Sequence, residues 1–231
     1  MNRLSRILGT LALGLLFGCA GEKPEPLVGN GEDALIVMDF SVAKPLHPLP
    51  NDWVKNEFFT RVPMKYSFGT YQGVPAMRFE TDNSASMLGR DLDIDLAQYP
   101  ILTWKWLVEV PITSTVSEKL PEGDDHPARL LVTLKTAKGE PRAFEIIWGN
   151  KEFRAGQYKV IGDFHHYTAN GGDPKLVGRW FEERLDLREI YRKIWKDGEQ
   201  PRLTHIAVFC DSDETDTRSV AWFSHITLRT R

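Results

Sequence analysis

The stretch that decides the fold class runs from Leu102 to Val110 and reads LTWKWLVEV. Every second residue in it is large and apolar, and a period of two places such residues on one face of a β-strand. The residues on that face are Leu102, Trp104, Trp106 and Val108. Two tryptophans flanked by aliphatic side chains favour a face in the core over a platform for sugar rings. The stretch therefore predicts a strand with one fully buried face.

Eight further segments have the length and the β-branched and aromatic content of strands. They are residues 35–40, 64–70, 76–80, 129–136, 142–148, 179–185, 205–210 and 220–229. Gly, Pro, Asn and Asp separate these segments, as is typical of turns. Nine short strands in series predict an all-β domain, a single β-sandwich of jelly-roll type.

Three of the segments also show which side chains should fill the sandwich. The expected interior residues are Phe144, Ile146 and Trp148 in one strand and Trp222, Ile226 and Leu228 in another. Cys210 alternates with Ile206 and Val208, so we expect it to be a small core residue rather than a nucleophile.

One short helix interrupts the strand pattern. Its apolar residues recur at positions i, i+3, i+4 and i+7, and they are Leu187, Ile190, Tyr191 and Ile194. Asp186 can cap the N-terminus, with Glu189 placed to complete a capping box. Gly198 and Pro201 are expected to end the helix. We expect this helix to cover an open end or edge of the sandwich.

The first residues of the chain predict export. Arg3 and Arg6 precede an apolar run of about a dozen residues, which is too short to span the ~30 Å core of a bilayer. The run ends in LFGC at residues 16–19, which resembles a bacterial lipoprotein box. That resemblance implies that residues 1–18 are a signal peptide, that cleavage falls before Cys19, and that the Cys19 thiol carries a lipid.

Residues 19–33 then form the lipidated cysteine and a flexible tether, because their Pro- and charge-rich composition cannot bury apolar surface. In the lipoproteins that this sequence resembles, an aspartate directly after the lipidated cysteine favours the inner membrane. Ala20 occupies that position here, so the expected location is the outer membrane, facing the periplasm. The sandwich domain is expected over residues 34–231. Cys210 would be its single thiol, which leaves the core without support from an internal disulfide.

The charge balance limits the partners. The chain has 29 Lys and Arg against 32 Asp and Glu, with no block of basic residues. This argues against nucleic acid as a partner. The membrane, reached through the N-terminal lipid, and a glycan or an envelope protein are the expected partners.

Two acidic loops could hold ligands. Asp124, Asp125 and Arg129 join a loop to a strand, where carboxylates and a guanidinium could bind a cation or sugar hydroxyls; a turn fixed by an Arg–Asp pair is the alternative. Asp211, Asp213 and Asp216 offer oxygen ligands at alternating positions within one loop, and such spacing could hold a structural calcium ion, although the glycine and distal glutamate of a helix-loop-helix calcium site are missing. A solvated turn is the alternative there.

Other ligand candidates lie on loops and outward faces. They are Lys105, Glu145, His165, His166, Tyr167 and Trp180. His165, His166 and Tyr167 are expected in a polar aromatic loop. Adjacent histidines on a strand would point to opposite faces, so His165 and His166 should not form a bidentate metal site by themselves.

Several segments in order carry a family resemblance: SASMLGRDLDID from residue 84, YPILTWKWLVE from residue 99 and EGDDHPARLLVTL from residue 122. Together they resemble the bacterial domain-of-unknown-function 3047 family. The resemblance implies an exported β-sandwich and brings no established reaction. The C-terminal strand also resembles those of galactose-binding-like modules, although His225 stands where those modules would have a calcium-binding aspartate.

FRAGQY at residues 153–158 resembles a strand of alginate-lyase-like jelly rolls, in which the tyrosine moves a proton. The resemblance implies a catalytic Tyr158, with Arg129, Lys105 and Glu145 as its partners. The companion strands of those enzymes are not matched: Arg78-Phe79-Glu80 is a poor counterpart of one, and the other is missing.

Three functions remain open from the sequence. No nucleophile elbow, phosphate loop, dinucleotide fingerprint or zinc spacing occurs, which favours a non-catalytic protein that binds a glycan or another envelope component. A polysaccharide lyase or hydrolase on the same fold is the first alternative. A structural lipoprotein that assembles with an envelope protein is the second.

Overall fold

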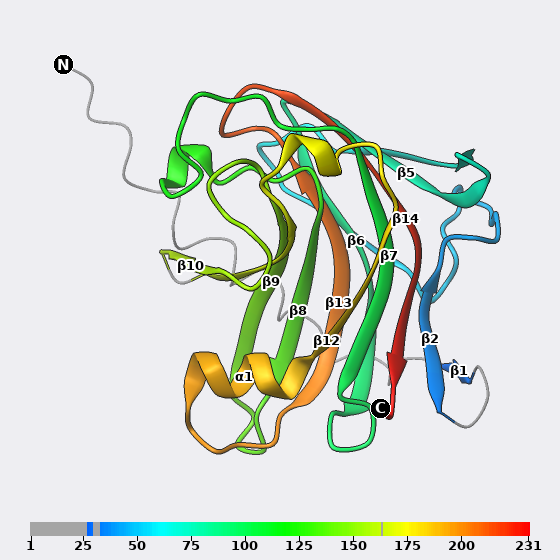
Figure 1. The fold of residues 1–231 in the computed structure, drawn as a ribbon. Helices are drawn as coiled ribbons and strands as arrows, with labels where there is room; N and C mark the ends of the chain where they lie inside the picture. The colour runs from blue at the N-terminus through cyan, green and yellow to red at the C-terminus, as the bar shows by residue number, and fades with distance from the viewer. Residues whose placement is uncertain (1–26, 30–32, 163) are drawn as a thin grey trace.

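The computed structural model of the chain describes residues 27–29, 33–162 and 164–231 (Figure 1). The predicted signal peptide, Cys19 and most of the predicted tether lie outside the described residues. Within them, strands dominate, and the all-β prediction is confirmed. No helix in this part of the chain combines the length and apolarity that crossing a bilayer requires.

Fourteen strands in the described residues form two sheets that face each other (Figure 1). Sheet A contains β1 (Val28–Gly29), β2 (Ala34–Asp39), β4 (Lys65–Tyr71), β5 (Val74–Asp82), β7 (Ile101–Val110), β12 (Phe181–Asp186) and β14 (Arg218–Arg229). Sheet B has the order β10 (Tyr158–Ile161), β11 (Phe164–Gly171), β9 (Pro141–Gly149), β8 (Arg129–Lys135), β13 (Arg202–Asp211), β6 (Ala85–Asp95) and β3 (Val54–Glu57). Only β9 and β11 pair in parallel among these strands.

Sheet A is organised around β14. One edge of β14 pairs with β7, while its other edge pairs first with β5 over residues 218–223 and then with β2 over residues 225–229. The sheet therefore forks on one side of its central strand. All nine strands expected from the sequence are present, and β1, β3, β6, β10 and β11 are additional.

The tryptophans of β7 lie at the centre of the core, as the alternation in LTWKWLVEV predicts. Trp104 and Trp106 have no exposed surface. The ring of Trp106 contacts Trp104, Trp148 and Phe223 at centroid distances of 5.3, 5.6 and 5.8 Å, mostly edge to face. Its indole N–H donates to Glu183 Oε1 at 3.2 Å, which satisfies one polar atom of this apolar centre. Cys210 is buried in the same core, as expected.

Trp222 is a correction to the sequence prediction. It packs with Leu107 and Val220 on the outside of sheet A, whereas Ile226 and Leu228 do point into the core. The register of β14 against β7 shifts between Phe223 and Ile226. Such an irregularity changes which residues face inward, so a strict period of two does not hold along this strand.

Helix α1 (Leu187–Trp195) lies across the lower end of the sandwich in the view of Figure 1. The Asp186 side chain accepts the backbone N–H groups of Arg188 and Glu189, so the predicted N-cap is confirmed. The helix ends at Lys196, which has a left-handed φ of 55°, rather than at Gly198. Leu187, on the apolar face, is fully buried in the core.

We expect Asp186→Ala to lower the free energy of unfolding by about 1 kcal/mol, because two N–H groups of the first turn lose their acceptor. Urea unfolding followed by circular dichroism would measure this loss. Asp186→Asn is the matched control, since Asn caps as well as Asp; an equal loss in both variants would contradict the capping role.

Candidate functional site

The candidate site lies on the outer face of sheet B, the face that points away from sheet A. Apolar side chains on this face form a cluster separate from the main core: Ala85, Met87, Leu131, Ala207 and Phe209. The strand register arranges the face in rows that run across the strands. A row here means one set of residues paired from strand to strand.

Three rows make up the central part of the face. The first is Thr168, Ile147, Arg129, Phe209 and Met87. The second is His166, Glu145, Leu131, Ala207 and Gly89. The third is Ala143, Thr133, His205 and Asp91. A Cβ on Gly89 would come within 2.7 Å of both Ala207 Cβ and His205 Nε2, so the second row admits no larger residue there.

Arg129 is the centre of the charged part of this face. Its guanidinium donates to Glu145 Oε2 at 2.6 Å and to Asp211 Oδ1 at 3.0 Å, and a further nitrogen lies 2.8 Å from Asp211 Oδ2. It also donates to the backbone carbonyl of Asp124. Burial alone would lower the pKa of Arg129, but the three carboxylates around it raise that pKa well above its ordinary value. Arg129 is therefore a permanently charged, fully paired cation.

The pKa of Glu145 is lowered to about 2. Burial would raise it, but the adjacent charges of Arg129 and His166 outweigh burial. Glu145 is thus ionised across the pH range in which proteins are folded.

His166 lies between two carboxylates. Its Nε2 is 3.2 Å from Glu145 Oε2 and 3.3 Å from Asp124 Oδ2, and the side chain has no exposed surface. Burial opposes protonation, yet Glu145 and Asp124 together raise the pKa of His166. Neither ring nitrogen makes a well-oriented hydrogen bond within the described part of the chain.

Lys159 and His126 complete the charged group. Lys159 Nζ donates to Asp124 Oδ1 at 2.6 Å and to the Glu118 carbonyl at 2.7 Å, and it lies 3.0 Å from His126 Nε2. Burial, followed by the charge of Lys159, lowers the pKa of His126 to about 4. The imidazole is therefore neutral at neutral pH: Nδ1–H donates to the Trp148 carbonyl at 2.8 Å and Nε2 accepts from Lys159.

Glu118 fastens the loops above this group. Its carboxylate accepts four successive backbone N–H groups, those of Asn150, Lys151, Glu152 and Phe153. The side chain is 1% exposed. One buried carboxylate thus ties the segment before β8 to the loop after β9.

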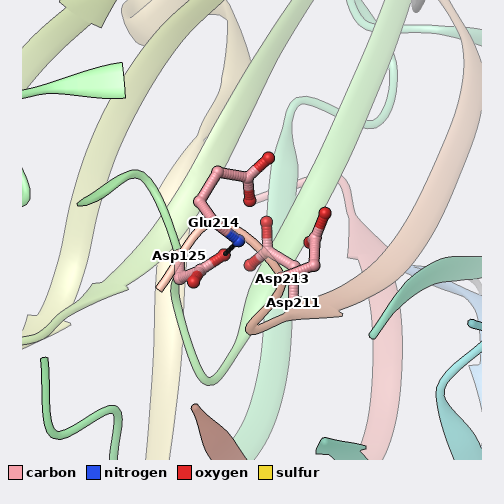
Figure 2. Close-up of side chains that lie close together, drawn as sticks. All are labelled: Asp125, Asp211, Asp213 and Glu214. Atoms are coloured by element: carbon pink, nitrogen blue, oxygen red, sulfur yellow. Dashed lines mark hydrogen bonds between the residues drawn. The ribbon is translucent and has the colours of Figure 1, made fainter. Parts of the chain in front are cut away.

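A group of four carboxylates lies beside Arg129 and could hold a metal ion (Figure 2). Asp125, Asp211, Asp213 and Glu214 each place one oxygen within 4.8 Å of the others. Oxygen ligands of this kind suit Ca²⁺, which takes six to eight of them. Burial raises the pKa of Asp211 and of Asp213, as expected where carboxylates crowd together.

The four carboxylates differ from the set expected from the sequence. Asp211 and Asp213 are among them, whereas Asp216 is not and occupies a turn with a left-handed φ of 53°. Asp125 comes from the other acidic loop, and it accepts the backbone N–H of Thr215 at 2.7 Å. The two loops that the sequence suggested separately therefore meet.

Three further candidates lie on the opposite side of sheet B. The Tyr158 hydroxyl bonds to His165 Nδ1, and the two rings stack with centroids 5.7 Å apart. His165 also contacts Trp195 of α1 at 5.6 Å. Tyr167 packs against the main core. His165 and His166 thus point to opposite faces.

Trp180 and Lys105 lie elsewhere, outside sheet A. Lys105 Nζ is 5.6 Å from the Trp180 ring centroid, and the Trp180 indole donates to the Tyr71 carbonyl at 3.2 Å. Of the four residues that the lyase resemblance implied, only Arg129 and Glu145 are in contact.

The sequence pointed to Asp124, Arg129, Glu145 and His166, which the structure brings together. It did not point to Glu118 or Lys159 as members of the same group. Lys159 stands on the short strand β10, where it alternates with apolar residues in the ordinary way for a surface strand. The signal that could have identified it is its pairing opposite His166, which only the fold provides.

We expect the charge on His166 to stabilise the fold only at the lower end of the neutral range. Its pKa is raised in the folded state, so its contribution is complete below the ordinary value of 6.5 and is lost as the pH rises through the raised pKa. In His166→Gln, the fall in free energy of unfolding between about pH 6 and pH 9 should be smaller than in the wild type.

Urea titrations at several pH values would measure this difference. His47→Gln is the matched control, because His47 is an exposed loop residue. An alkaline loss of stability that is unchanged in His166→Gln would show that the Asp124–His166–Glu145 contact carries no pH dependence.

The profile of the DUF3047 family, described as proteins of unknown function, matches residues 51–227. No curated protein matches the chain in sequence.

Among solved structures, the chain is similar to the family 11 carbohydrate-binding module of the cellulosomal cellulase Lic26A-Cel5E of Clostridium thermocellum, with 11% identity, a TM-score of 0.39, and coverage of 86% of this chain and 95% of that chain. A family 30 carbohydrate-binding module has 14% identity and a TM-score of 0.42, with 73% and 74% covered. The xyloglucanase domain of NopAA from Sinorhizobium fredii has 9% identity and a TM-score of 0.43, with 79% and 95% covered.

Proposed function

Because the chain belongs to the DUF3047 family, whose function is unknown, we propose its function from the site itself: it binds a neutral glycan on the outer face of sheet B. The observation that carries the proposal is a set of buried polar atoms on this face that have no hydrogen-bond partner among the described residues. They are Thr168 Oγ1, Thr133 Oγ1, His205 Nε2 and His166 Nδ1.

These atoms belong to side chains that are almost fully buried. His166 and Thr168 have no exposed surface, and Thr133 and His205 are 5% and 7% exposed. A buried polar atom without a partner costs about 1–3 kcal/mol. The proposal is that a bound glycan supplies partners to these four side chains, which lie on one face within three neighbouring rows. It requires this face to open, because none of the four side chains is more than 7% exposed.

The chemistry of the face favours an uncharged, hydroxyl-rich ligand. The two buried cations, Arg129 and Lys159, are already paired with carboxylates, so neither is available to a carboxylate or sulfate group. Hydroxyl and imidazole groups both donate and accept, which matches sugar hydroxyls.

The same geometry supports a binding role over a catalytic one. A general acid must hold a proton near the working pH, whereas Glu145 has a pKa of about 2. The Tyr158 hydroxyl is engaged with His165 on the other side of the sheet. The residues that the lyase resemblance implied therefore do not form a set that could transfer a proton. The competing proposal is a structural lipoprotein that assembles with an envelope protein.

We expect a neutral polysaccharide to raise the melting temperature of the full chain in detergent micelles, because a ligand bound only by the folded state stabilises it. A panel of neutral and uronic-acid polysaccharides, each with calcium and with chelator, would be compared. Thr133→Val should weaken binding about fivefold, since one hydrogen bond contributes about 1 kcal/mol.

Thr103→Val is the matched control, because Thr103 is similarly buried, at 6% exposed, but lies in sheet A. A shift with acidic polymers alone, or equal affinity in both variants, would contradict the proposal. A loss of melting temperature with chelator alone would assign calcium to the four carboxylates of Figure 2.

The proposed location is the bacterial envelope. In this proposal the signal peptide is removed, Cys19 carries the lipid, and the tether holds the sandwich at the periplasmic face of the outer membrane. The support is the LFGC sequence at residues 16–19 and the residue that follows it.

We expect Cys19→Ser to abolish incorporation of labelled palmitate and to leave the uncleaved precursor, because the thiol that accepts the lipid is gone. Labelling of growing cells followed by membrane fractionation would measure both effects. Cys210→Ala is the control, since Cys210 is buried and its thiol pKa is raised by burial. Unchanged labelling in Cys19→Ser would exclude the anchor.

A further inference from the structure

Strand β10 forms one edge of sheet B. Within the described part of the chain it pairs with β11 alone, and Figure 1 shows it as the leftmost strand in that view. In an antiparallel ladder, only alternate residues of an edge strand bond to the neighbouring strand, and the others direct their N–H and C=O groups away from it. The free edge of β10 therefore offers backbone donors and acceptors to another strand.

Two large apolar side chains of β10 are exposed. Tyr158 is 43% exposed and Val160 is 51% exposed. They are two residues apart, so they lie on the same face of the strand. The other large apolar side chains that are exposed in the described residues, such as Phe59 and Leu120, lie in loops. In this part of the chain, β10 is thus the only strand with exposed side chains of this kind.

The other edge strands carry polar or charged side chains where they are exposed, or are very short. On β3 the exposed residues are Lys55 and Glu57, which form an ion pair. On β12 they are Glu182 and Arg184, and on β4 the first is Lys65. Strand β1 has only two residues. Charged side chains and short length both discourage an edge strand from pairing with another chain, and the exposed side chains of β10 lack that protection.

The single charged residue of β10 does not protect its edge. Lys159 is 7% exposed, and its Nζ donates to Asp124 Oδ1 at 2.6 Å and to the Glu118 carbonyl at 2.7 Å. Its charge is therefore paired inside the same copy of the chain. Two β10 strands can approach each other without bringing unpaired like charges together, which suits a second copy as the partner.

We propose that β10 pairs in antiparallel with β10 of a second copy of this chain, which forms a symmetric dimer. A strand that pairs in antiparallel with itself obeys a two-fold axis, so each copy covers Tyr158 and Val160 of the other. The remaining edges are protected, and the assembly therefore stops at two copies. The inference goes beyond the proposed function and does not depend on it.

The dimer joins the two B sheets into one continuous sheet. Antiparallel pairing about a two-fold axis keeps the same face of both sheets on the same side, so the two outer faces lie next to each other. The contact consists of one four-residue strand and its side chains from each copy. It is smaller than the ~1,200–2,000 Å² of stable interfaces, and the dimer therefore forms only at high protein concentration.

Sedimentation velocity of the full chain in detergent micelles, at rising protein concentration, tests this pairing. We expect the wild type to shift from monomer to dimer and Val160→Lys to stay monomeric throughout, because the new lysines add like charges at the interface. Val42→Lys is the matched control, since Val42 is a loop valine that is 57% exposed. A wild type that stays monomeric, or one that forms larger oligomers, would overturn the inference. The same holds if the two variants behave alike.

Cross-linking gives a second readout that does not depend on the lysine variant. Val160→Cys adds an exposed thiol, whereas Cys210 is buried and burial raises its pKa. A short bismaleimide should join two copies of Val160→Cys, with Val42→Cys as the control and the wild type as the background. Equal cross-linking in Val160→Cys and Val42→Cys would show that β10 is not the contact.

Discussion

The buried charge of Arg129 is the constraint on which the candidate site depends. Three carboxyl-bearing residues converge on it from β9, β13 and the loop before β8. A buried cation without partners is strongly unfavourable, and removing one partner of such a pair typically costs about 3–5 kcal/mol. Each segment that supplies a carboxylate is therefore fixed in place by the others. The positions of the loops that border the outer face therefore depend on the ion pairs of Arg129.

The electrostatic and the hydrogen-bonding parts of the face have different roles. At the Arg129 end, positive and negative groups satisfy one another and leave little for a ligand, which suits a rigid boundary. Toward the Lys135 end, hydroxyl and imidazole atoms lack partners within the described residues. The paired charges at the Arg129 end leave no free cation for a charged ligand. In the proposed function, binding therefore depends on the neutral hydroxyl and imidazole groups.

The sequence identified most strands because alternation and turn residues are local properties. It missed β6, in which Arg90, Asp91 and Asp93 interrupt the apolar pattern, although Arg90 is buried against the Val37 carbonyl. It placed Trp222 in the wrong layer because a register shift depends on the partner strand. The sequence predicted only part of the site. Asp124 and Arg129 are close in sequence, but Lys159 reaches them only because β10 pairs with β11 and β11 pairs with β9.

The position of β14 bears on how the protein is made. Residues 225–229 pair with β2, which begins at residue 34, so sheet A is completed by contacts that span most of the chain. Closing such long loops slows folding, and a nascent chain that has not yet released residue 229 lacks the central strand of one whole layer. Until then the core side of β7, with Trp104 and Trp106, has no complete sheet around it. The partly synthesised chain therefore cannot reach its final structure, which suits the export as an extended polypeptide that we propose.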